Sequence, residues 1–172
     1  MIQSRKWPAV EPDRLPLTES ERAILDYWLA LRGNAIRPAR TQVLPEELAP
    51  WIGWLHLIEV VDGGADFIYR IFGDQLSAQT GFDMSRTSVR QWEPKFRFEM
   101  ALSLYGQVAE SGQPHYHANT EIFSEESHRT FTRIVLPLGD AETVTHILVL
   151  LSRRDDVMEF PPTEILVAPS VG

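Results

Sequence analysis

The sequence predicts a mixed α+β domain with about five antiparallel strands, and three observations point to this class. Residues 66–73 read Asp-Phe-Ile-Tyr-Arg-Ile-Phe-Gly, and such aromatic and β-branched side chains favour a strand that is covered on both faces. Helical spacing of apolar residues occurs twice, over residues 18–33 and 94–110. Three more strand-like segments follow the second helix, which completes the α+β pattern.

The composition is that of one folded domain. The chain has 172 residues, 44% of them hydrophobic, which is enough to build a core. Its net charge of -8 argues against non-specific binding to nucleic acid and to anionic membrane surfaces. It has no cysteine, so disulfides, thiol nucleophiles and thiolate metal sites are excluded. Because we find neither a signal peptide nor a bilayer-spanning segment, we expect a cytoplasmic protein.

The domain boundaries follow from local composition. Residues 1–16 carry prolines and charges without periodicity, so we expect a flexible N-terminal arm. A single domain is expected over residues 17–154, and it begins with an amphipathic helix over residues 17–33. Residues 155–172, acidic and then interrupted by prolines, are expected to form a C-terminal tail.

The first helix has a clear start and an apolar stripe. Thr18 and Glu21 match a capping box, and Gly33 supplies a stop. The stripe must pack either on the sheet of its own domain or against a second copy of the helix, and we expect a homodimer. The interface residues predicted for such a dimer are Ile24, Tyr27, Trp28 and Leu31.

The remaining elements follow in a simple order. Residues 55–61 and 66–73 form a hairpin around the turn Asp62-Gly63-Gly64. The helices expected between this hairpin and the last strands are the only material available to cover one face of the sheet. The opposite face then needs the first helix, a partner chain, or both. These later elements are the helices over residues 74–80 and 94–110, and the strands over residues 114–123, 128–138 and 144–153.

Several short motifs occur in an order that resembles the PAS domain family, in particular short stand-alone bacterial PAS proteins. The motifs are Pro38-Ala-Arg40, Phe67-Ile-Tyr-Arg-Ile-Phe-Gly73, Gly81-Phe-Asp83 and Arg133-Ile-Val-Leu-Pro-Leu138. The resemblance covers roughly residues 21–153. In one place the chain departs from it, because those proteins often carry Thr-Gly where this chain has Ser85-Arg86. That departure affects the local turn and any ligand contact made there.

The resemblance implies a five-stranded sheet with a helical cover over a small cavity, and a ligand between the sheet and the long helix. The residues between the sheet and the long helix either line a ligand cavity or fill an ordinary core. The cofactor stays unknown, and covalent flavin photochemistry is excluded because it needs a cysteine. The lining implied by the resemblance comprises Trp92, Phe96, Met100 and Leu104 from the cover, and Tyr69, Tyr116 and Phe131 from the strands.

Two arginines stand among hydrophobic residues on strands that we expect to be central. Arg70 and Arg133 either form salt bridges or recognise an anionic small molecule through the guanidinium fork. Both interpretations stay open at this point, and both residues are candidate ligand contacts.

A second constellation suggests metal chemistry. His115, His117 and Glu121 share one face of a strand, with a spacing that resembles the first metal motif of cupins. The glycines expected around that motif are absent, and a long helix directly before it argues against a jelly roll. The other interpretation is that these residues form the solvated face of an outer strand.

We therefore expect a PAS-like sensory and signalling module, not an enzyme, that binds a small molecule or a protein partner. It would signal through a homodimer, with no attached effector, so that its output passes to a separate protein or through a changed dimer. The alternatives are a cupin-type metal-dependent enzyme using the His-x-His-x3-Glu site, and an interaction domain with a filled core.

Overall fold

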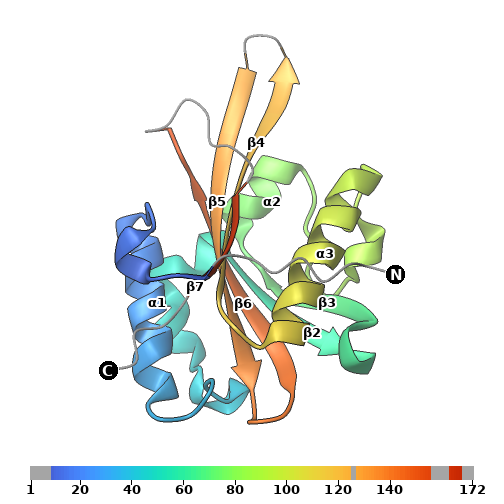
Figure 1. Ribbon diagram of the computed structural model, residues 1–172. Coiled ribbons are helices and arrows are strands. Elements are labelled where there is room, and N and C mark those ends of the chain that lie inside the picture. Colours follow the sequence, from blue (N-terminus) through green and yellow to red (C-terminus); the bar gives the residue numbers. More distant parts are fainter. Residues whose placement is uncertain (1–8, 125–126, 156–162, 168–172) are drawn as a thin grey trace.

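In the computed structural model, residues 9–124, 127–155 and 163–167 are described, with side chains for residues 9–120 and 129–155. A single twisted sheet runs through the middle of the molecule, with helices on both of its faces (Figure 1). Five adjacent strands of this sheet are antiparallel, which confirms the predicted α+β class and five-stranded sheet. These strands are β2 (Leu55–Val61), β3 (Asp66–Phe72), β4 (His115–Ser124), β5 (Ser127–Gly139) and β6 (Val144–Arg153).

Two additional strands extend the sheet beyond β4, giving the order β1-β7-β4-β5-β6-β2-β3. Strand β7 (Thr163–Val167) pairs antiparallel with β4, and β1 (Ala9–Val10) pairs parallel with β7. Both strands come from segments that the sequence indicates as an arm and a tail. Because of β7, strand β4 lies inside the sheet and not at its edge.

The helix α1 (Glu19–Arg32) begins as its sequence predicts. The Thr18 hydroxyl accepts a hydrogen bond from the Glu21 amide at 3.1 Å, and the Glu21 carboxylate accepts one from the Thr18 amide at 3.0 Å. Gly33, with φ of 53°, ends the helix. The other helical elements are α2 (Asp74–Thr80), α3 (Lys95–Ser111) and the 3-10 helices η1 (Pro12–Arg14), η2 (Arg40–Gln42), η3 (Pro45–Trp54), η4 (Asp62–Gly64) and η5 (Val89–Gln91).

The two faces of the sheet have separate hydrophobic cores. Helix α1 and the 3-10 helix η3 cover one face, whereas α2, η5 and α3 cover the other (Figure 1). Trp28 of α1 is 1% exposed, and its indole Nε1 donates a hydrogen bond of 2.8 Å to the Pro137 carbonyl of β5. The chain therefore covers the face opposite α3 with its own first helix.

A β-bulge at Arg70 changes which side chains of β3 face α3. The pairing register passes from Leu57 opposite Ile71 to Ile58 opposite Tyr69, so Arg70 is the extra residue. Strict alternation along this strand would put Tyr69 and Ile71 on one face and Phe72 on the other. After the bulge, Phe72 instead joins Tyr69 in the core under α3, while Ile71 packs in the core under α1.

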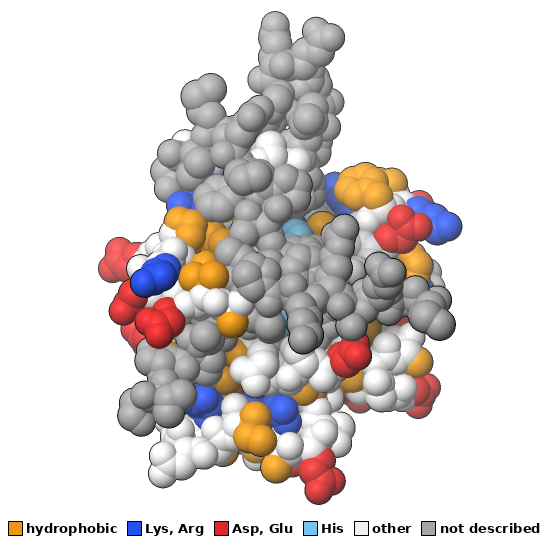
Figure 2. Space-filling view, viewed as in Figure 1, with side chains coloured by type: hydrophobic (Ala, Val, Ile, Leu, Met, Phe, Trp, Pro, Cys, Tyr) orange, Lys and Arg blue, Asp and Glu red, His pale blue; other side chains and the backbone are white. Residues whose placement is uncertain are grey.

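The visible surface shows no large patch of one kind in its described part. Acidic and basic side chains are interspersed there with small hydrophobic areas (Figure 2).

Candidate functional site

A cavity of about 70 Å³, counted as space open to the centre of a water molecule, lies between α3 and the sheet. Six elements surround it: α2 and α3 form its cover, and strands β2, β3, β5 and β6 contribute its floor. Trp92, in the segment between η5 and α3, also belongs to the cover and is 8% exposed. The cavity thus lies between both helices and the face of the sheet that they cover.

Five of the nine residues predicted to contact a ligand line this cavity. They are Tyr69, Trp92, Met100, Phe131 and Arg133. Their side chains reach it because each belongs to the α3 cover or to the strand face beneath it.

The other four predicted ligand contacts lie elsewhere. Phe96 is 55% exposed on the outer side of α3, and Leu104 is buried in the core beside the cavity. Tyr116 points to the opposite face of the sheet, among the residues under α1. Arg70, at the bulge, is exposed and pairs with Glu59, so the salt-bridge interpretation holds for this arginine.

Several lining residues were missed by reasoning from the sequence, above all His56, Phe72 and Arg97. His56 stands directly opposite Phe72 in the β2–β3 register, so the bulge brings both to the same face. The available sequence signal for His56 is a polar residue inside the apolar strand Leu-His-Leu-Ile. Arg97 lies one turn before Ala101 on α3, and its guanidinium lies 5.7 Å from the centre of the Trp92 ring.

A buried polar cluster forms one wall of the cavity. The Trp92 Nε1 donates a hydrogen bond of 2.9 Å to the Tyr69 hydroxyl, which lies 3.3 Å from the hydroxyl of Tyr105. Burial raises the pKa of both tyrosines, so both hydroxyls stay protonated at neutral pH. The rings of Tyr69 and Trp92 meet edge to face, at 89°. This wall is therefore uncharged at neutral pH and able to donate or accept hydrogen bonds.

His56 is the least satisfied polar group of the site. Its side chain is 5% exposed, and its ring packs 5.0 Å from Tyr69 and 4.6 Å from Phe72, centre to centre. Its Nδ1 is buried and has no hydrogen-bond partner among the described residues. Burial, followed by the positive charge of Arg133, lowers the pKa of His56 to about 3. The imidazole is therefore neutral at pH 7, with one donor and one acceptor nitrogen.

Arg133 brings a positive charge to the floor of the cavity. It is 7% exposed, and its Nη1 contacts the side-chain oxygen of Asn119 and, at 3.4 Å, the Nδ1 of His117. Burial and this same charge lower the pKa of His117 to about 3. The positive charge of Arg133 therefore lowers the pKa of two buried histidines, His56 and His117.

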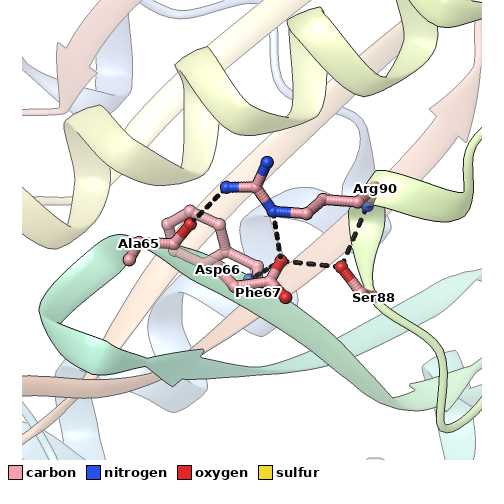
Figure 3. Close-up of polar contacts among 5 residues, drawn as sticks. All are labelled: Ala65, Asp66, Phe67, Ser88 and Arg90. Atoms are coloured by element: carbon pink, nitrogen blue, oxygen red, sulfur yellow. Dashed lines mark hydrogen bonds and ion pairs between the residues drawn. The ribbon is translucent and has the colours of Figure 1, made fainter.

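The loop that carries Trp92 is fastened to the start of β3. Figure 3 shows the Asp66 carboxylate between the Ser88 hydroxyl, which donates to it at 2.7 Å, and the Arg90 guanidinium, 3.7 Å away. Arg90 also donates to the Ala65 carbonyl at 2.8 Å. Further along, the Arg86 amide donates to the Tyr69 carbonyl at 2.7 Å. These bonds hold the loop of Trp92 against β3, and of their partners only Tyr69 also lines the cavity.

The predicted metal site does not form from the residues that are described. His115 and His117 are 1% and 5% exposed, so the prediction of a solvated outer face is wrong for both. The Nε2 of His115 lies 3.0 Å from the Ser111 hydroxyl, and burial lowers its pKa to about 4. The side chain of Glu121 lies outside the described residues. Within the described part of the chain, no group of three or more His, Asp or Glu side chains is placed to hold a metal ion.

The structure is thus an α+β domain in which helices cover a small cavity on an antiparallel sheet. A family model described as a PAS domain matches residues 17–152, and the chain therefore belongs to the PAS domain family. This membership makes it a sensory or signalling module in general terms. Curated proteins yield no match to the chain. Among the helices that are described, none is both long enough and apolar enough to cross a membrane.

Proposed function

We propose that this PAS domain senses a small molecule that binds in the cavity under α3. The observation that carries the proposal is His56, a residue of the cavity lining whose buried Nδ1 has no hydrogen-bond partner among the described residues. Leaving a buried polar group unsatisfied costs about 1–3 kcal/mol. A bound molecule that forms a hydrogen bond with this imidazole would remove that cost.

The size and lining of the cavity suit a small ligand. By the same measure a single water needs about 10–15 Å³, and an engineered cavity of about 150 Å³ takes benzene. A cavity of 70 Å³ therefore holds several waters or a molecule smaller than benzene. Its lining combines aromatic rings with a few convergent polar groups, which is the usual composition of ligand sites.

Strand β5 connects the residues that line the cavity with helix α1 on the opposite face of the sheet. Arg133 and Phe131 face the cavity, whereas Thr132 between them donates a hydrogen bond to the buried carboxylate of Glu21 on α1. Farther along β5, the Pro137 carbonyl accepts the Trp28 hydrogen bond. A ligand that favours one position of β5 would therefore also favour one position of α1.

The output of such a change would go to a protein partner or to a second copy of the chain. Ile24 and Trp28, two of the four predicted dimer residues, are buried against the sheet of their own chain. Tyr27 and Leu31 are half-buried. Self-association through α1 would therefore use the accessible side of the helix, with Tyr27 and Leu31 at its margin.

A fragment screen by NMR tests the proposal. The panel contains neutral, anionic and cationic molecules of up to about six non-hydrogen atoms, and the reporter is the indole N–H signal of Trp92. Ala101, 4% exposed, lines the cavity, so Ala101→Leu fills it. Ala109→Leu is the matched control, because Ala109 lies on the same helix outside the cavity.

We expect at least one fragment to shift the Trp92 signal in the wild type and in Ala109→Leu, with the shift lost in Ala101→Leu. If no fragment moves this signal, or if Ala101→Leu binds as the wild type does, the proposal is wrong.

A further inference from the structure

We infer that the ligand of this cavity is a small uncharged carbonyl compound, whose oxygen accepts a hydrogen bond from the Tyr69–Tyr105 pair. The inference rests on the proposed function and adds the chemical class of the ligand. It is carried by the number of hydrogen-bond donors in one wall of the cavity, by the groups beside them and by the available volume.

The wall formed by Trp92, Tyr69 and Tyr105 has one donor more than it uses. The indole of Trp92 can only donate, and its Nε1 donates to the Tyr69 hydroxyl at 2.9 Å. The hydroxyls of Tyr69 and Tyr105, 3.3 Å apart, share one further hydrogen bond, in either direction. One indole hydrogen and two hydroxyl hydrogens thus make two bonds, so one hydroxyl hydrogen has no acceptor among the described residues.

This spare hydrogen belongs to a buried pair that lines the cavity. Tyr69 is 1% exposed and Tyr105 is 4% exposed, and both belong to the lining. If Tyr69 donates to Tyr105, the spare hydrogen is that of Tyr105, and in the reverse case it is that of Tyr69. A buried donor without an acceptor is unfavourable in both cases. A ligand that offers an acceptor oxygen to this pair is therefore stabilised.

His56 brings a second donor to the same region. Its ring centre lies 5.0 Å from that of Tyr69, and its buried Nδ1 has no hydrogen-bond partner among the described residues. As a neutral imidazole it carries one N–H. A carbonyl oxygen has two lone pairs, so it can accept from a hydroxyl and from an N–H together. An ammonium, which has donors only, would leave both of these hydrogens without an acceptor.

The donors of this wall are uncharged, which favours an uncharged ligand. Burial raises the pKa of both tyrosines and lowers that of His56 to about 3, so all three groups are neutral at pH 7. A charged ligand would lose its hydration here without meeting an opposite charge in this wall. The arginines of the lining each contact another side chain: Arg129 contacts Gln79, Arg133 contacts Asn119, and Arg97 lies over the ring of Trp92.

The volume limits the carbon part of the ligand. At about 70 Å³ the cavity is roughly half the size of one that takes benzene, so about four non-hydrogen atoms fit. The rings of Phe72, Trp92 and Phe131 supply apolar surface for methyl groups. Acetone, with a carbonyl between two methyl groups, meets these demands. Isobutene has the same shape with a CH2 group in place of the oxygen, and acetate has a charged oxygen in place of one methyl group.

The experiment titrates protein carrying ¹³C at the tyrosine Cζ atoms with acetone, isobutene and acetate, each separately. The Trp92 indole signal reports occupancy, and the Cζ signals of Tyr69 and Tyr105, assigned with the two Tyr→Phe variants, report hydrogen bonding of the hydroxyls. We expect acetone and isobutene both to shift the Trp92 signal, and only acetone to shift a Cζ signal of the pair. Acetate should bind about tenfold more weakly than acetone, because it buries a charge beside neutral groups.

Two variants control for the place of binding. Ala101→Leu, which fills the cavity, should abolish the acetone shifts, whereas Ala109→Leu, on the same helix outside the lining, should keep them. The inference is overturned, and the proposed function left standing, if bound acetone moves neither Cζ signal, if isobutene moves them equally, or if acetate binds as tightly as acetone. Absence of any acetone shift also overturns it, and the wider fragment panel then decides the proposed function separately.

Discussion

Gly73 sits where β3 ends and α2 begins, and its replacement by alanine should be strongly destabilising. Its φ of −58° is ordinary, so alanine adds no backbone strain. An added Cβ, however, would lie 2.2 Å from the carbonyl oxygen of Gly53, 2.4 Å from its carbonyl carbon, and 2.7 Å from the oxygen of Ile52. All three are backbone atoms of η3, which cannot rotate away as a flexible side chain would.

The magnitude follows from that geometry. Overpacking typically costs about 1–3 kcal/mol, and the upper end applies here because η3 and α2 must separate to admit the methyl group. We therefore expect Gly73→Ala to lose about 3 kcal/mol of unfolding free energy. Gly106→Ala is the matched control. It lies inside α3 with no atom within 4 Å of the added Cβ, and should stabilise by about 1 kcal/mol.

The assay is urea unfolding followed by tryptophan fluorescence, for which the chain carries five reporters. A Gly73→Ala variant within about 0.5 kcal/mol of the wild type would refute the close approach of η3 to α2. Since α2 contributes Leu76 to the cavity, such a result would also undermine the cavity itself.

Three more predictions concern a turn, the buried histidines and the first helix. Arg86 has φ of 64°, a conformation that costs an L-residue about 1–2 kcal/mol, whereas glycine adds about 0.5–1 kcal/mol of chain entropy. Arg86→Gly should therefore raise the urea stability by about 0.5 kcal/mol, and a loss of stability would contradict the strain. His56 and His117 have folded pKa values of about 3, below the unfolded value of about 6.5. Their contribution is fully present above pH 6.5 and is lost as the pH falls toward 3, by about 1.4 kcal/mol per pH unit for each histidine. The unfolding free energy should thus decrease between pH 6.5 and pH 4.5, and His56→Phe should make this slope shallower; an unchanged slope would mean that His56 is not buried in its neutral form. Trp28→Glu should unfold the chain, because it buries a charge under α1, whereas Tyr27→Glu should stay folded. Sedimentation velocity on Tyr27→Glu then tests whether the accessible side of α1 forms a dimer, and an unchanged dimer would exclude that side.

The regular elements could be predicted because their signals are local. The bounds of β2 and β6 agree with the sequence pattern, since each is a long apolar run between turn residues. The start of α1 follows from the hydroxyl of Thr18 and the carboxylate of Glu21, three residues apart. By contrast, β1 has only two residues, too few for any period, and its pairing depends on β7 at the far end of the chain.

The site was only partly predictable, because a cavity is defined by long-range packing. The bulge at Arg70 shifts the pairing of β3 by one residue and brings Phe72 opposite His56. No residue type in the sequence predicts this bulge. Tyr116 is of a residue type that often lines ligand sites, but its position on β4 places its side chain in the core under α1. Where the PAS resemblance predicts a glycine, Arg86 adopts the left-handed conformation that glycine favours.

The most direct measurement on the ligand site is the ¹⁵N NMR spectrum of the His56 imidazole, recorded with and without a fragment that shifts the Trp92 indole. If the cavity is a binding site that His56 completes, the ring nitrogen signals of His56 will move on saturation. The signals of His146, a half-buried residue of β6 outside the cavity lining, will not move. A saturating fragment that leaves the His56 signals unchanged would contradict the account.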